Sequence, residues 1–150
     1  MTDWNNKEEV LEVVRKEGRK LKQASKELRA DREVVLAALK NYYGDFMTLK
    51  YASDELRGDK EVVLAAVKNL GVALQYASKE LRADKEVVMA AMRSNSFPLR
   101  YASKKLLADK EVVMAAVKQD KYVLGYGLQN ADESLKKDPE FMKEVEQYLE

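Results

Sequence analysis

The feature that most limits the possible folds is a phrase of about ten residues that recurs along the chain, DKEVVLAAVK and its variants. Subtracting the numbers of the leading acids of the four close copies gives intervals of 28, 25 and 25 residues, and degraded copies flank them. The copies begin at the polar residues Asn6, Asp31, Asp59, Asp84, Asp109 and Asp138. A repeat of this length predicts an all-α fold. We expect an α-solenoid of about five helix-hairpin repeats of about 25 residues plus a C-terminal capping helix, in a single domain spanning residues 1–150.

Signals at both ends predict the first helix of each repeat, which we name helix A. The leading Asp or Asn offers a side-chain oxygen to free backbone N–H groups. A glutamate follows in the first turn and a lysine or arginine comes near the other end, where the helix dipole favours each charge. Residues 62–67 are all apolar, which is too many for one stripe. Helix A is therefore expected to be buried on more than one side.

A second helix of about 8 to 10 residues, helix B, is predicted before each later cap. Leu74, Ala77 and Leu81 are spaced three and four residues apart, which places them on one helical face, and the other repeats keep this pattern. Helices this short are marginal alone in water, so neighbouring repeats must stabilise them. Two further columns are expected to be structural, one of interhelical or back-bonding serines and one of tyrosines packed between adjacent helices B. They are Ser53, Ser78, Ser103 and Tyr51, Tyr76, Tyr101.

The terminal copies differ from the inner ones at one position. Glu12 and Glu144 stand where the inner copies have alanine, so the outer helices are expected to be amphipathic, as capping repeats must be. The chain is thus expected to form a complete solenoid. Residues 1–5 are expected to fray, unless Trp4 folds back onto the first helix.

The connectors between helices A and B vary in length and carry aromatic residues. Insertions occur in NYYGDFM and in QDKYVLGYG, and a proline-containing connector, SNSFP, lies between them. Equivalent connectors of a solenoid line one edge, which we name the rim. Large aromatic side chains on loops are favoured anchors for protein contacts, and the alternative is that they pack inward and fill the gaps. The candidate partner-binding residues are Tyr42, Tyr43, Phe46, Phe97, Pro98, Tyr122 and Tyr126.

The composition argues against an enzyme. The chain has no histidine and no cysteine, which removes His-based triads and the usual zinc ligands. The pattern isolates no carboxylate in an apolar pocket, as acid–base catalysis requires, and contains no glycine-rich phosphate loop. We therefore expect no catalytic residue, no cofactor and no metal. The capping role accounts for the aspartate column without calcium.

The charge balance gives only a weak indication of partners. The chain has 27 basic and 26 acidic residues, finely mixed along the sequence, which disfavours a strong nucleic-acid footprint. Basic residues nevertheless fill part of one repeat column, for which we consider ion pairs to acids of a neighbouring turn, or a basic ladder for an anionic surface. That column consists of Arg29, Arg57, Arg82, Leu107 and Lys136.

Three functional hypotheses follow. The first is a protein-binding scaffold, an effector or an inhibitor, that acts by occupying a partner's surface. The alternatives are a nucleic-acid or anionic-surface binder and a purely structural or self-associating module. We expect a monomer or weak homo-oligomer, without a membrane span, in the cytoplasm or delivered into a host cell.

The phrases LKYASDELRGDKEVVLAAVKN and LQYASKELRADKEVVMAAM resemble a helical tandem-repeat family known as domain of unknown function 4116. The resemblance covers residues 6–118 closely and 119–150 weakly, and the inserted connectors depart from the regular pattern. It implies a helical module found in tandem in bacterial, viral and algal proteins. It implies no activity, cofactor or binding residue.

Overall fold

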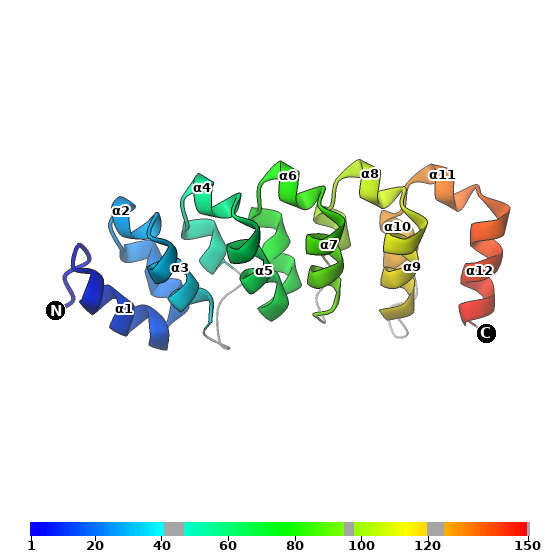
Figure 1. The fold of residues 1–150 in the computed structure, drawn as a ribbon. Coiled ribbons are helices and arrows are strands. Elements are labelled where there is room, and N and C mark those ends of the chain that lie inside the picture. Colours follow the sequence, from blue (N-terminus) through cyan, green and yellow to red (C-terminus); the bar gives the residue numbers. More distant parts are fainter. Residues whose placement is uncertain (41–46, 95–97, 120–124, 150) are drawn as a thin grey trace.

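The computed structural model describes residues 1–40, 47–94, 98–119 and 125–149. These residues form an elongated row of helical repeats with the two termini at opposite ends (Figure 1). Within the described ranges there are helices, turns and bends but no strand. The predicted α-solenoid is confirmed.

One layer of the row consists of the A helices, which face the viewer in Figure 1. Their bounds are α1 Lys7–Lys16, α3 Arg32–Leu39, α5 Lys60–Asn69, α7 Lys85–Met92, α9 Lys110–Gln119 and α12 Pro139–Leu149. Each begins after a predicted cap, whose side chain accepts a hydrogen bond from the backbone N–H three residues on. At Asp59 this bond comes from Val62 at 3.0 Å, and the first and last caps, Asn6 and Asp138, make it at 3.1 Å. The capping prediction is confirmed.

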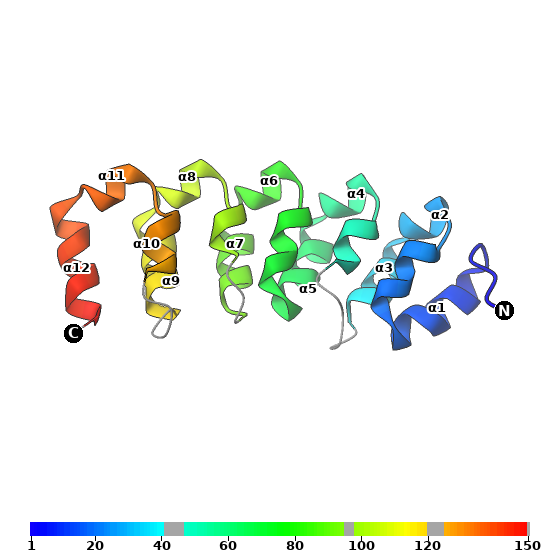
Figure 2. The same ribbon diagram turned by 180° about the vertical axis from the view of Figure 1, so that it is seen from behind.

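The prediction of one continuous helix B is wrong. In most repeats the second arm is a 3₁₀ helix followed by a break and a separate four-residue α-helix. The 3₁₀ helices are η1 Gly18–Gln23, η2 Thr48–Tyr51, η3 Gly71–Tyr76 and η4 Leu99–Tyr101, and the last repeat has α10 Tyr126–Asn130 instead. The four-residue helices are α2 Lys26–Arg29, α4 Asp54–Arg57, α6 Lys79–Arg82, α8 Lys104–Leu107 and α11 Glu133–Lys136. The 3₁₀ helices and α10 form the second layer, and the four-residue helices follow one edge of the row (Figures 1 and 2).

A serine caps the helix after the break in the first four second arms, and Asp132 does so in the last. Ala77 and Ser78 are extended, with ψ of 158° and 161°, and the Ser78 hydroxyl accepts the Leu81 N–H at 3.3 Å. A serine that caps a new helix competes with continuation of the preceding one. The hydroxyls of these serines are therefore N-caps, and the prediction that they bond back within their own helix is wrong, whereas their backbone N–H groups do make interhelical bonds. Leu74, Ala77 and Leu81 are nevertheless all buried, so the predicted apolar spacing correctly identified the core.

The break frees a backbone group to join consecutive repeats. The Ser53 N–H donates to the Arg29 carbonyl oxygen at 3.0 Å, and the Ser78 N–H donates to the Arg57 carbonyl oxygen at 2.9 Å. The equivalent bonds later in the row run from Ser103 to Arg82 and from Asp132 to Leu107, at 2.9 and 2.8 Å. Each four-residue helix thus anchors the next one.

The N-terminal residues take the place of a preceding repeat. The Ser25 N–H donates to the Trp4 carbonyl oxygen at 2.9 Å, and the Trp4 side chain packs against the core. The Asp3 N–H donates to Glu9 Oε2 at 2.8 Å. The expectation that residues 1–5 fray is therefore wrong for this turn, and the alternative, that Trp4 folds back, is correct. At the two ends of the row, Glu12 and Glu144 are exposed, as predicted.

The core runs along the row between the two layers. One cluster of buried side chains extends from Val10 to Ala116, and a second joins α9 to the C-terminal cap through Val113, Phe141 and Val145. The layers approach each other closely where a 3₁₀ helix begins with glycine. A Cβ on Gly71 would lie 2.1 Å from the Ala91 carbonyl oxygen of the next repeat.

We predict opposite effects for two glycine-to-alanine substitutions. Gly71→Ala should destabilise the chain by about 1 to 3 kcal/mol, because the new methyl group overlaps the backbone of α7. Gly58→Ala should be neutral or stabilise by up to about 1 kcal/mol, because its new Cβ would come no closer than 3.3 Å to other atoms and alanine occupies the equivalent positions 30, 83 and 108. Urea denaturation measures both. Equal free energies of unfolding for the two variants would contradict the proposed close approach.

Candidate binding surfaces

A network of ion pairs connects the N-terminal ends of the A helices. The residue after each inner cap is Lys or Arg, and its side chain reaches the next repeat. Lys60 Nζ lies 2.8 Å from both Asp84 and Glu86 carboxylate oxygens. The same pairing, which we name the clamp, links Lys7 to Asp31 and Glu33, Arg32 to Asp59 and Glu61, Lys85 to Asp109 and Glu111, and Lys110 to Asp138.

The clamp changes the electrostatics of the capping aspartates. Lys60 holds the pKa of Asp84 below its usual value, with help from the Val87 N–H and against the opposing effect of partial burial. At Asp59 the Val62 N–H is the largest cause of the lowered pKa, and Arg32 adds to it. The Lys60 pKa is raised in turn by Asp84 and then Glu86. Each aspartate thus has two roles, since it caps its own helix and binds the preceding one.

Sequence reasoning assigned only the capping role and missed the clamp cations. The sequence does contain a pattern that indicates these cations, because Lys or Arg follows the cap directly in each copy from Asp31 to Asp109 and Lys7 follows Asn6. Only the stacked structure shows that these side chains point toward the next cap rather than into solvent.

The predicted rim is only partly described by the structure. Five of its candidates lie outside the described residues; they are Tyr42, Tyr43, Phe46, Phe97 and Tyr122. Pro98 is buried at the start of η4, and Tyr126 is half-buried against the core. These two residues follow the alternative expectation, that connector side chains pack inward.

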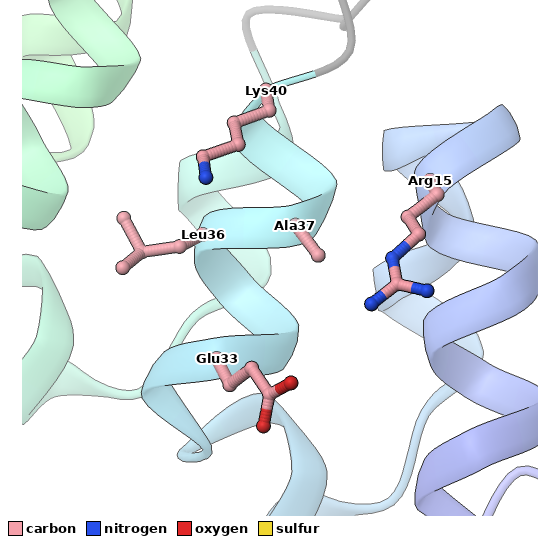
Figure 3. A pocket seen from close by; sticks show the side chains of 5 residues that line it. All are labelled: Arg15, Glu33, Leu36, Ala37 and Lys40. Carbon is pink, nitrogen blue, oxygen red and sulfur yellow. The ribbon is translucent and has the colours of Figure 1, made fainter.

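The A-helix layer carries a groove near its N-terminal end. It lies between α1 and α3, has a volume of about 450 Å³, and is lined by Arg15, Glu33, Leu36, Ala37 and Lys40. In Figure 3 Ala37 faces α1, the Arg15 side chain extends toward α3, and Glu33 lies near the opposite end of the groove from Lys40. The groove therefore combines apolar lining with charged ends.

The two layers differ in charge, although the charges alternate along the sequence. Most of the charged residues of the second layer and its edge are basic. The cations there are Arg19, Lys20, Lys22, Lys26, Arg29, Lys50, Arg57, Lys79, Arg82, Arg100, Lys104, Lys105, Lys136 and Lys137. The acids in the same segments are Glu17, Glu27, Asp54, Glu55, Glu80, Asp132 and Glu133. The chain therefore has a basic side although its net charge is only +1.

A second groove lies on this basic side, at the edge of the row. It has a volume of about 490 Å³, and its lining includes Arg57, Tyr76, Lys79 and Arg82. The tyrosine column is half-buried and packs against the core, in agreement with the structural role expected for it. The predicted ion pairs with acids of a neighbouring turn are present at two positions of the arginine column, between Arg57 and Asp54 and between Lys136 and Glu133.

Two further searches concern only the described residues. No group of three or more His, Cys, Asp or Glu side chains is arranged there to hold a metal ion. No helix in these ranges has the length and apolar character needed to cross a membrane.

We predict that Asp84→Asn separates the clamp from the cap. Asparagine still caps α7, so the loss at pH 7 should stay below about 1 kcal/mol, whereas Asp84→Ala should cost about 1 kcal/mol more. The lowered Asp84 pKa means that its charge contributes fully above the unfolded pKa of about 3.9 and that the contribution is lost as the pH falls through the folded value. The stability difference between wild type and Asp84→Asn should therefore shrink in acid. Thermal melts from neutral pH to pH 3 measure it, and a constant difference would contradict the clamp.

Comparison with known proteins identifies the repeat. The family model described as domain of unknown function 4116 matches five overlapping segments, residues 6–57, 44–82, 59–107, 84–127 and 109–145. No curated protein and no solved structure matches the chain. Because the matches together cover residues 6–145 and four of the five begin at a cap of the structural repeats, this protein belongs to the domain of unknown function 4116 family.

Proposed function

We propose that this chain is a non-enzymatic scaffold that binds another protein through its A-helix layer. The observation that carries the proposal is the groove at α1 and α3, whose lining combines the apolar Leu36 and Ala37 with the charged side chains of Arg15, Glu33 and Lys40. An apolar centre within a polar border is the usual anatomy of a protein interface.

The surface chemistry of this groove repeats along the layer. Part-exposed Leu64 and Met89 occupy the position of Leu36 in the next two A helices. Lys40, Lys68 and Arg93 are exposed at the equivalent position near the end of each helix. A partner could therefore contact several repeats in the same way.

A stable complex would cover only a small part of the chain's surface. A standard protein interface buries about 800 Å² on each partner. The chain exposes 9072 Å² in all, so about a tenth of its surface would be covered. A chain of this kind would act by covering a partner's surface, as an inhibitor or an effector, in the cytoplasm or within a host cell.

We predict that reversing three exposed charges of this layer weakens partner binding. The variant Lys40→Glu/Lys68→Glu/Arg93→Glu should lower the affinity about tenfold or more, because it reverses the charge beside the part-exposed apolar residues of this layer. Affinity capture from source-cell extract with mass spectrometry identifies the partner, and calorimetry with the purified partner measures the loss. Each reversal also costs about 0.3–1 kcal/mol at a helix C-terminus, so thermal melts must show the variant folded at the assay temperature.

Two control variants locate the surface. Lys22→Glu/Lys79→Glu/Lys104→Glu makes the same change of charge on the second layer and its edge, and it should leave the affinity unchanged. Tyr42→Ala/Tyr43→Ala/Phe97→Ala/Tyr122→Ala tests the rim prediction. Loss of binding in the rim variant alone, with the A-helix variant still binding, would overturn the proposed surface.

A further inference from the structure

A recurring polar feature of the described residues lies on the other side of the row. Four buried side-chain atoms in those ranges lack a hydrogen-bond partner, and three of them are the Nε atoms of Arg29, Arg57 and Arg82. These arginines occupy one repeat position, the last residue of α2, α4 and α6. Buried donors normally have partners, so three equivalent exceptions require an explanation.

The position of two of these arginines at a groove offers an explanation, namely that their guanidinium groups bind a ligand there. Arg57 and Arg82 both line the 490 Å³ groove, together with Tyr76, Gln75 and Lys79. With Nε shielded from water, the outer nitrogens of each guanidinium carry its hydrogen bonding to the groove. Two forked cations and a lysine around one groove favour planar anions such as carboxylates.

The structure already contains one such contact. Arg57 Nη2 pairs with the Asp54 carboxylate three residues earlier, the single acid in the lining of this groove. Asp54 is 93% exposed and Arg57 is 33% exposed, so the pair contributes little to stability and is open to exchange. At the position of Asp54, the helices of Arg29 and Arg82 carry Lys26 and Lys79, so those guanidinium groups have no acid there.

The spacing of the arginines selects the shape of the occupant. Packed helices lie about 8 to 10 Å apart, so consecutive repeats place one arginine about every 10 Å along the edge. A peptide in the extended polyproline II conformation rises about 3.1 Å per residue with three residues per turn, so it covers that distance in three residues and turns every third side chain to the same face. A peptide with an acidic residue at every third position therefore matches the row.

The chemistry favours a peptide over a nucleic acid. Tyr51, Tyr76 and Tyr101 are half-buried against the core, which leaves little of each ring for stacking with bases. Exposed acids such as Asp54 and Glu80 lie along the same edge and would repel a continuous phosphate backbone.

We propose that the edge formed by α2, α4 and α6 is a second binding surface that accepts an extended acidic peptide, with one carboxylate at each of Arg29, Arg57 and Arg82. This surface is separate from the A-helix layer and does not depend on the function proposed for that layer. The backbone bonds between repeats hold the three arginines at a constant spacing.

The test uses the purified full chain and synthetic peptides of about 15 residues. One peptide has glutamate at every third position among glycine and serine, and an isomer has the same residues with the glutamates in a block. Calorimetry at low salt should show the spaced peptide binding about tenfold more tightly than the blocked one. Equal affinities, or no binding of either peptide, would overturn the proposal, and tighter binding of an oligothymidylate of similar charge would replace the peptide by a nucleic acid.

Variants assign the binding to this edge. Arg57→Gln/Arg82→Gln should reduce the affinity of the spaced peptide about tenfold or more, and Arg57→Lys/Arg82→Lys should recover only part of it because the planar fork is lost. Lys79→Gln changes an exposed residue of the groove, keeps the fold, and should reduce the affinity by about threefold. The matched variant Lys68→Gln/Arg93→Gln removes two charges from the opposite layer. If it weakens binding as much as the arginine pair does, the attraction is general and the proposed surface is wrong.

Discussion

The stacking of this solenoid depends on one backbone hydrogen bond per repeat, between a serine or aspartate N–H and the carbonyl oxygen that ends the four-residue helix before it. That bond forms because a capping side chain breaks the second arm and turns the backbone outward. A helix of four residues has no stability alone, since helix nucleation is costly. Its place in the row is fixed by the neighbour it bonds to and by the core beneath it.

The clamp acts at the same edge of the row, because each capping aspartate lies two residues after the last residue of a four-residue helix, and it joins side chains rather than backbone groups. Four of the five clamp cations approach both the cap and the first-turn glutamate of the next A helix, so the helix dipole and the ion pairs favour the same charges. Because these pairs are partly exposed, they specify the spacing of the repeats more than they add to stability.

The consequence for function is a molecule with two different long surfaces. The A helices present part-exposed apolar residues beside cations, and the edge of the second layer presents arginines beside half-buried tyrosines. Both surfaces repeat with the period of the fold. A partner that follows the row can therefore use the same contact several times, and the length of the array sets how many contacts are available.

The sequence by itself determined the repeat, the caps and the buried positions, because these depend on local patterns: Asp59 caps the helix that follows it, and Leu74, Ala77 and Leu81 are apolar wherever the core lies. It did not determine the break at Ser78, since the same apolar spacing fits a continuous helix. Nor did it determine the reach of Lys60 to Asp84 or the sorting of charge between layers. These features join residues about one repeat apart, and only stacking brings such residues together. The physical reason is that capping and amphipathicity act within one turn of the chain, whereas clamps, inter-repeat bonds and binding surfaces exist only between repeats.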